Sequence, residues 1–284
     1  MIFFFSNGRL GNQLFQYAGL KFFFPDQKLV FFGCENLIKV LSECSVISFS
    51  FQKISKYIAP NLLEKFFNLF VKIKLIGLIQ EVSDKNNYFV KKKRGLIPNC
   101  FLLKNSFFQH KVVLDRLKND FRIKSMHIKK AMKWLEFNNL DLNINNLVFV
   151  HIRRGDYLFW PNPKSPAVLS SDYYSKGMIR FRSQIKSPKF IILTDDFFYV
   201  NDIFGNKKDI FISKNNLFVD LALMSLCSCG ILSPSSFSWW GAWLSFNRKA
   251  NKLRVYIAPE YWGGHRSKNW EPEGFESNWI TYTK

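Results

Sequence analysis

The chain has 284 residues, of which 48% are hydrophobic and 18% aromatic, so it is able to bury a large core. A charged fraction of 22% together with 32 phenylalanines excludes an intrinsically disordered protein. The 41 lysines and arginines exceed the 21 aspartates and glutamates by 20 charges, which indicates an anionic partner. Nucleic acid, an acidic membrane surface and a phosphorylated small molecule all meet this requirement, and composition does not choose among them.

The positive charge is concentrated in the first half of the chain. Residues 1–140 hold 23 basic and 9 acidic residues, a net +14, whereas residues 141–284 hold 18 and 12, a net +6. The basic segment 62–79 and the run Lys91–Arg94 indicate docking to an anionic membrane leaflet, with a merely solvated basic face as the alternative.

The location of the protein is predicted from three further features. The five cysteines lack paired CxxC spacing, the chain starts without a basic leader, and no apolar run approaches the roughly 18 residues of a membrane span. We therefore expect reduced thiols in a cytoplasmic protein that is soluble or peripheral on the inner face of the cytoplasmic membrane.

The N-terminal half opens as strand, loop and helix. The apolar run Ile2–Phe5 predicts a buried parallel strand, and a turn with two glycines follows it. Residues 12–23 have helical spacing, and residues 28–32 predict a second strand. Basic amphipathic segments come next, at 62–79, 112–120 and 126–137.

From residue 147 onward, strand and helix patterns alternate regularly. The predicted strands are 147–152, 190–193, 209–212, 230–232 and 254–257, and the predicted helices are 172–183, 217–227 and 238–246. This alternation is typical of an α/β fold with a parallel sheet, which binds ligands beyond the carboxyl ends of its strands. The Asn-rich stretch 138–146 predicts the boundary between two domains, 1–140 and 141–284.

The first of these strand ends carries two arginines. His151 and Arg153 share one face of an extended segment, and Arg154 points to the other. The planar donor fork of a guanidinium suits a pyrophosphate. The alternative is a salt-bridged strand terminus in which Arg154 pairs with Asp156.

The next strand end, at Thr194, is followed by the adjacent carboxylates of Asp195 and Asp196. Such a pair either binds a divalent metal or caps the following helix. Two acidic residues are weak evidence for a metal, and we expect none.

Serines open the helix after the strand at 230–232. Ser235, Ser236 and Ser238 lie where the first backbone N–H groups of a helix lack partners, and such a terminus attracts phosphate. Plain N-capping by Ser235 or Ser236 is the alternative. The three tryptophans that follow are predicted to lie in the core.

Two further sites are less specific. Asp220, at the start of a predicted helix, either complements the helix dipole or accepts hydrogen bonds from guanine. The glycine turn with Arg9, Gly11 and Asn12 matches neither the dinucleotide-binding fingerprint nor a P-loop, but it lies at another strand end.

Taken together, these motifs resemble those of the bacterial and animal α-1,2-fucosyltransferases (galactoside 2-α-L-fucosyltransferases), and they occur in the same order. They are Gly8-Arg-Leu-Gly-Asn-Gln-Leu-Phe-Gln-Tyr-Ala18, His151-Ile-Arg-Arg-Gly-Asp-Tyr157, Leu193-Thr-Asp-Asp196, Asp220-Leu-Ala-Leu-Met-Ser225 and Ser235-Ser-Phe-Ser-Trp-Trp-Gly-Ala-Trp243. Residues 34–140 match no such motif, so the choice of acceptor is not covered. Pro234 is a departure, since a polar residue is expected there.

The resemblance implies a GT-B-like architecture of two Rossmann-like halves, with an acceptor-side domain at 1–140 and a GDP-fucose-binding domain at 141–284. It implies a metal-independent, inverting transfer of L-fucose from GDP-β-L-fucose to the 2-hydroxyl of a terminal β-galactose, as in lipopolysaccharide O-antigen biosynthesis. A fucosyltransferase of another linkage, or a basic nucleic-acid-binding protein of a different class, are the alternatives. No nucleic-acid-binding pattern is found, so we expect no nucleic acid as partner.

The resemblance also implies roles for single residues. Arg153 is similar to the pyrophosphate ligand, and His151 and Asp220 are similar to guanine contacts. The donor-binding set is completed by Arg9, Gly11, Arg154, Thr194, Asp195, Ser235, Ser236, Phe237 and Ser238. By similarity to protein O-fucosyltransferases, Asn12 is expected beside the reacting centre. Asp156 is the nearest candidate for the general base, although it is equally suited to orienting Arg154, and the base stays unassigned.

Overall fold

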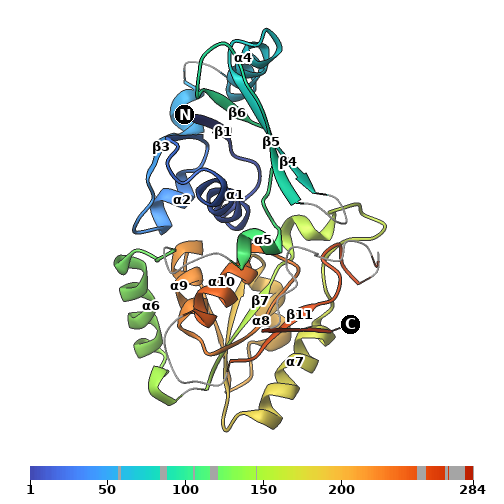
Figure 1. Cartoon of the computed structure of the whole chain (residues 1–284). Helices are drawn as coiled ribbons and strands as arrows, with labels where there is room; N and C mark the ends of the chain where they lie inside the picture. Colours follow the sequence, from blue (N-terminus) through green and yellow to red (C-terminus); the bar gives the residue numbers. More distant parts are fainter. Residues whose placement is uncertain are drawn as a thin grey trace. The chain divides into compact units, whose positions relative to one another are not determined.

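The computed structural model describes residues 1–56, 59–83, 88–104, 106–115, 121–144, 146–247, 254–265, 268 and 279–283 (Figure 1). The chain divides into two compact units, Met1–Arg122 and Ile123–Lys284. The sequence predicted the division at 140/141 instead. The difference arises because helix α6 (Ser125–Phe137) packs on α9 (Leu217–Leu226) and so belongs to the second unit.

The first unit is built on a six-stranded sheet in the order β3-β2-β1-β6-β4-β5. The strands are β1 (Ile2–Phe5), β2 (Leu29–Phe32), β3 (Val46–Phe49), β4 (Gly77–Ser83), β5 (Tyr88–Lys93) and β6 (Phe101–Leu103). All neighbours pair in parallel except β4 and β5, which form an antiparallel hairpin.

Phenylalanines on both faces of this sheet pack against helices. On one face Phe31 lies 6.4 Å, between ring centroids, from Tyr17 of α1 (Leu10–Phe23). On the other face Phe5 and Phe32 lie 5.4 and 5.7 Å from Phe67. Phe67 belongs to α4 (Pro60–Lys72), so α1 and α4 cover opposite faces. Three short helices complete the unit: α2 (Glu35–Val40), α3 (Phe51–Ile54) and α5 (Lys111–Leu114).

The second unit contains an all-parallel sheet in the order β12-β11-β10-β7-β8-β9. The strands are β7 (Leu147–Ile152), β8 (Lys189–Thr194), β9 (Ile210–Ile212), β10 (Cys229–Ile231), β11 (Tyr256–Pro259) and β12 (Ile280–Thr283). Besides α6 and α9, the helical segments are η1 (Leu142–Ile144), η2 (Gly155–Leu158), α7 (Ser171–Gln184), α8 (Phe197–Phe204) and α10 (Ser236–Phe246).

This strand order places a topological switch point at the middle of the second sheet. From β7 the chain builds outward through β8 to β9, then returns and builds through β10 to β12 on the other side. The connections after β7 and β10 therefore leave in opposite directions at the carboxyl edge, which is where doubly wound sheets bind their ligands. The two motifs richest in polar groups follow these two strands.

The predicted strands Ile2–Phe5 and Leu147–Ile152 are confirmed with the same bounds. Segment 62–79, predicted as one basic amphipathic segment, instead contains most of α4 and the start of β4. The helix stops because Lys74 adopts a positive φ of 59° and the N–H of Leu75 donates back to the carbonyl of Phe70 at 2.9 Å. In the segment predicted at 112–120, α5 is short, and residues 116–120 lie outside the described residues.

Candidate active site

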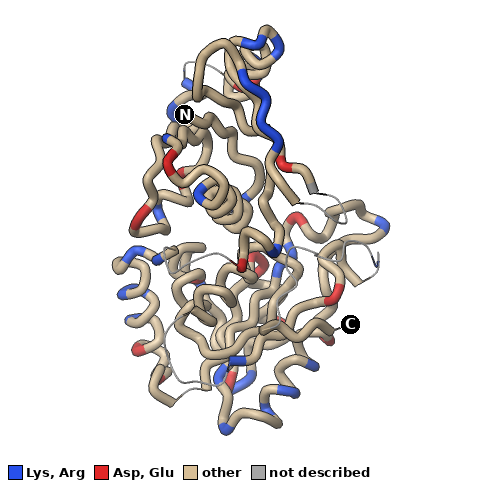
Figure 2. Tube along the Cα trace, viewed as in Figure 1, with Lys and Arg blue, Asp and Glu red and all other residues tan. Residues whose placement is uncertain are grey.

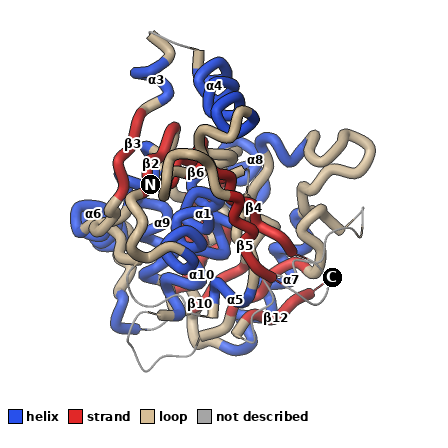
Figure 3. Tube along the Cα trace, turned by 45° about the horizontal axis from the view of Figure 1, so that its top comes forward, coloured by secondary structure: helices blue, strands red, loops and turns tan. Residues whose placement is uncertain are grey.

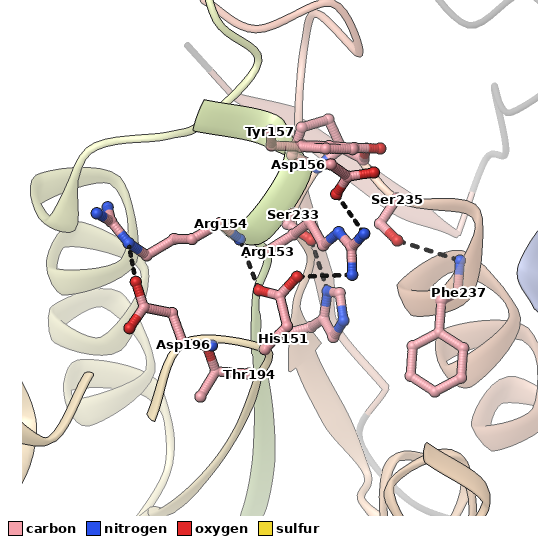
Figure 4. Close-up of polar contacts among 12 residues, drawn as sticks. His151, Arg153, Arg154, Asp156, Tyr157, Thr194, Asp196, Ser233, Ser235 and Phe237 are labelled. Carbon is pink, nitrogen blue, oxygen red and sulfur yellow. Dashed lines mark hydrogen bonds and ion pairs between the residues drawn. The ribbon is translucent and has the colours of Figure 1, made fainter. Parts of the chain in front are cut away.

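Polar side chains from three strand ends converge at the carboxyl edge of the second sheet. Figure 4 shows groups that follow β7, β8 and β10 pointing toward one another. The labelled residues are His151, Arg153, Arg154, Asp156, Tyr157, Thr194, Asp196, Ser233, Ser235 and Phe237. The structure thus brings together most of the residues predicted for the C-terminal half.

The Arg153 guanidinium is held between two carboxylates. Its Nη2 contacts Oδ1 of Asp156, and its Nη1 lies 2.7 Å from Oδ2 of Asp195. The Arg153 side chain is only 13% exposed, whereas that of Asp156 is 50% exposed. The sequence-based pairing of Asp156 with Arg154 is therefore wrong, because the compact turn η2 returns Asp156 to the face of Arg153.

Arg154 points the other way, as the alternation along the strand predicted. Its Nε lies 3.0 Å from Oδ2 of Asp196, and its guanidinium stacks 3.3 Å from the centre of the Tyr199 ring. Asp196 also caps α8, because its Oδ1 accepts the N–H of Tyr199 at 3.2 Å. Arg154 is thereby fixed to the start of α8, a structural rather than a ligand-facing position.

Asp195 contacts both Arg153 and Arg154. While its Oδ2 contacts Arg153, its Oδ1 accepts the backbone N–H of Arg154 at 2.8 Å. Gly155 makes this approach possible: a Cβ there would lie 2.6 Å from Oδ2 of Asp195. A side chain at 155 would push the carboxylate away from Arg153.

The acidic pair is thus engaged with arginines. The Thr194 hydroxyl accepts the N–H of Asp196 at 3.0 Å and stabilises the turn after β8. In the part of the chain that the structure describes, no group of three or more His, Cys, Asp and Glu side chains is arranged to hold a metal ion.

His151 is buried and uncharged. Its Nδ1 lies 2.5 Å from the hydroxyl of Ser233, and its ring centroid lies 5.6 Å from that of Phe237. Burial, and secondarily the charge of Arg153, lower the pKa of His151 to about 3. This imidazole offers a ligand hydrogen bonds but no positive charge, so Arg153 supplies the charge on this face.

The start of α10 lies beside this group. Ser235 is the N-cap, and its hydroxyl accepts the N–H of Phe237 at 3.3 Å. The Ser238 hydroxyl is buried and donates to the carbonyls of Ser233 and Ser235 at 3.1 and 2.9 Å. A direct ligand contact by that hydroxyl, expected from the sequence, does not fit this position. The first turn of the helix still presents its positive dipole end.

The unexpected Pro234 has a defined contact in this turn. Its carbonyl accepts a hydrogen bond from the hydroxyl of Tyr157 at 2.7 Å. This bond ties the motif after β7 to the loop after β10. The tryptophans that follow, Trp239, Trp240 and Trp243, are buried, as predicted.

Asp220 is buried in the first turn of α9. That helix begins at Leu217 and is capped by Asn216, so Asp220 is its fourth residue. The Ser213 hydroxyl, just beyond β9, donates to its Oδ1 at 2.6 Å. Burial outweighs this bond and raises the pKa of Asp220 to about 7.

Arg9, Gly11 and Asn12 lie in the first unit, at the carboxyl end of β1. Gly8 adopts a positive φ of 87° in the turn, Arg9 is exposed, and Gly11 is buried inside α1. The side chain of Asn12 accepts a hydrogen bond at 3.1 Å from Gln109, which follows β6. The predicted roles of these residues stay predictions.

Sequence reasoning missed four residues with defined contacts. Ser233 binds His151, Tyr199 stacks on Arg154, Ser213 binds Asp220, and Gln109 binds Asn12. Ser213 and Ser233 follow predicted strands, so the rule that ligands bind at carboxyl strand ends was able to find them. Gln109 and Tyr199 were out of reach because neither β6 nor α8 was predicted.

The chain is similar to several known proteins. The family model described as Glycosyl transferase family 11 matches residues 3–283. The O-antigen biosynthesis glycosyltransferase WbnK of Escherichia coli is 28% identical, covering 92% of this chain and 95% of that protein. The alpha-1,2-colitosyltransferase of Escherichia coli is 29% identical, covering 90% of each.

Among solved structures, POFUT1 in complex with GDP-fucose has a TM-score of 0.57 at 15% identity, covering 90% of this chain and 97% of that one. This likeness concerns the fold. Together with the two mostly parallel sheets it confirms the predicted α/β, GT-B-like architecture.

The raised pKa of Asp220 makes stability depend on pH. Below about pH 4 the carboxyl is protonated in both the folded and the unfolded chain, and the cost of burying its charge grows as the pH rises to about 7. The folded protein therefore loses stability over this pH range, and we expect Asp220→Asn to abolish this loss. The stability of the variant relative to the native protein should rise by up to about 4 kcal/mol across this window.

Urea denaturation between pH 4.5 and 8 measures the difference. The matched control is Asp202→Asn at an exposed position of α8. A difference between Asp220→Asn and the native protein that does not change with pH would contradict the buried, titrating carboxyl.

Proposed function

Because the chain belongs to glycosyl transferase family 11, we propose that it is a galactoside α-1,2-fucosyltransferase. It transfers L-fucose from GDP-β-L-fucose to the 2-hydroxyl of a terminal β-galactose in a surface glycan. The observation that carries the proposal is the guanidinium of Arg153 beside the helix start of α10, at the switch point of the second sheet.

The diphosphate is the group that these elements suit. A planar guanidinium and the positive end of a helix both bind phosphate oxygens, and both are held in place before the ligand arrives. Arg153 is fixed from one side by the less exposed Asp195, while the half-exposed Asp156 occupies its other arm. In our proposal the diphosphate replaces Asp156 on Nη2, and Asp195 keeps the guanidinium in position.

This exchange gives Asp156 a second task. As fucose leaves as an oxocarbenium-like species, negative charge grows on the β-phosphate and is met by Arg153 and α10. The acceptor hydroxyl has to lose a proton, and a carboxylate released from its ion pair is a competent base. We assign this role to Asp156.

Neighbouring groups support guanine as the base of the donor nucleotide and transfer that needs no metal. The carboxylate of Asp220 matches the N1–H and 2-amino donors of guanine, and the buried, uncharged His151 is assigned as a second guanine contact. Since Asp195 and Asp196 are paired with arginines, charge stabilisation is assigned to Arg153 and α10, and transfer is proposed to need no metal.

The linkage is supported by a relative rather than by the fold. The similar alpha-1,2-colitosyltransferase carries the same linkage in its name, which favours transfer to a 2-hydroxyl.

The decisive experiment incubates the protein with GDP-fucose or GDP-colitose and a panel of β-galactosides, followed by linkage analysis of the product. An α-1,2-fucosyl product is expected. A product that carries only colitose, or that has another linkage, would contradict the proposed donor or linkage. Stabilisation of the protein by an oligonucleotide instead of GDP would overturn its assignment as an enzyme.

Arg153 should be essential for turnover. Removing one preorganised charge-stabilising donor costs about 10²–10³-fold in rate, and a full charge lies at the upper end. We expect Arg153→Ala to lose about 10³-fold in kcat, and Arg153→Lys to fail also, because an ammonium lacks the planar fork. Arg154→Ala should act mainly by lowering the melting temperature.

The matched control is Arg182→Ala, which removes an arginine paired with Asp209 at 2.8 Å elsewhere in the same unit. It should retain turnover. Loss of all activity in EDTA, with rescue by Mn²⁺ or Mg²⁺, would show that a metal provides the charge stabilisation.

Asp156→Asn separates the two tasks of Asp156. The neutral amide releases Arg153 more easily, so GDP affinity should stay equal or increase severalfold. Without a base, kcat should fall by about 10²-fold or more. Isothermal titration with GDP and steady-state kinetics measure the two effects, and an unchanged kcat would remove Asp156 from the proton transfer.

A further inference from the structure

Helix α4 of the first unit carries two apolar stripes. One stripe, with Leu63, Phe67, Phe70 and Val71, packs on the core of the sheet. The second consists of Leu62, Phe66, Leu69 and Ile73, which recur every three or four residues and therefore form one line along the helix. Their exposed fractions lie between 44% and 57%, so the second stripe faces solvent.

The chain segment after β5 extends this stripe. The N–H of Leu96 donates to the carbonyl of Lys74 at 2.8 Å, and that of Ile97 donates to Leu75 at 2.9 Å. Leu96 and Ile97 therefore lie beside the end of α4, and they are 78% and 43% exposed. We call the six residues Leu62, Phe66, Leu69, Ile73, Leu96 and Ile97 the docking surface.

Basic residues border the docking surface on the same side of the sheet. Strand β4 sets the register: Leu78 pairs with Leu102 of β6 and with Lys93 of β5. Leu102 belongs to the core beneath α4, and directly paired residues share a face, so Lys93 and Lys91 project on the α4 side.

The opposite face of β5 receives Lys92, whose Nζ lies 4.3 Å from the centre of the Phe101 ring. Lys72, Lys74 and Arg94 are exposed near the end of α4 and of β5. Figure 2 shows the basic run along β5 as a continuous blue stretch. Figure 3 shows α4 as a helix and β5 as a strand, and both belong to the first unit.

We propose that the docking surface binds an anionic lipid bilayer, with α4 lying in the plane of the headgroups. An exposed apolar stripe beside lysines is the pattern of interfacial helices. The basic border favours an anionic bilayer over an uncharged apolar partner, because each basic residue near such a surface strengthens binding by about fivefold. Among the described residues, no helix has the length and apolarity required to cross a membrane. The inference goes beyond the proposed function and does not depend on it.

Vesicle sedimentation tests the proposal. The full chain is mixed with vesicles of 30% phosphatidylglycerol in phosphatidylcholine, or of phosphatidylcholine alone, at low salt and at 0.5 M NaCl. We expect binding to the anionic vesicles at low salt, at least tenfold weaker binding to phosphatidylcholine, and weakening at high salt. Hydrogen exchange at residues 60–73 should slow when the anionic vesicles bind.

Two variants divide the contributions. Leu62→Gln/Phe66→Gln/Leu69→Gln keeps good helix formers on α4 but removes the apolar stripe, and Lys91→Ala/Lys93→Ala/Arg94→Ala removes the basic border. Each should weaken vesicle binding at least tenfold. The matched controls are Lys129→Ala/Lys130→Ala/Lys133→Ala on α6 and Ile179→Gln/Phe198→Gln, all at exposed positions of the second unit, and they should bind as the native protein does.

Circular dichroism melting and turnover in solution verify that each variant is folded. Absence of binding, equal binding to both kinds of vesicle, or equal loss in the controls would overturn the proposal. Concentration-dependent self-association that only the Gln variant of α4 abolishes would also overturn it, since a second copy of the chain would then cover the stripe.

Discussion

The hydrogen bond between His151 and Ser233 links the ends of two strands whose connections diverge. Strands β7 and β10 are neighbours, and the chain leaves them in opposite directions, so the sheet itself does not connect the segments that follow them. The His151–Ser233 bond and the bond from Tyr157 to Pro234 connect these segments. Together they hold the arginine motif at a set distance from the start of α10. Burying a neutral imidazole makes this link without adding a charge.

The arginines of the site are paired with carboxylates before any ligand binds. Two guanidinium groups face three carboxylates, and each arginine is fixed by an acidic residue after β8. A positive charge held at the sheet edge by Asp195 needs little rearrangement when a phosphate arrives, which is the essence of electrostatic preorganisation. The more exposed Asp156 is the member of the set that moves at the lowest cost.

The sequence predicts what depends on local pattern. Periodicity finds β1 and β7, and the rule that ligands bind at carboxyl strand ends finds the segments containing Arg153, Asp195 and Ser235. The sequence does not predict which carboxylate each arginine binds, because this pairing depends on the turn η2 and on which strand lies next to β7. Strand β4 is missed because its first residues fall in the amphipathic segment 62–79, where α4 ends at Lys72 and Lys74 reverses the chain.

The position of β5 has a consequence for solubility. This strand is the outermost of its sheet, so one of its edges leaves backbone donors and acceptors available to a strand from another molecule. Consecutive lysines at positions 91–93 repel a second identical edge and oppose such pairing. In a chain with 32 phenylalanines, many of them in short apolar strands, this repulsion protects the folded chain from edge-to-edge aggregation.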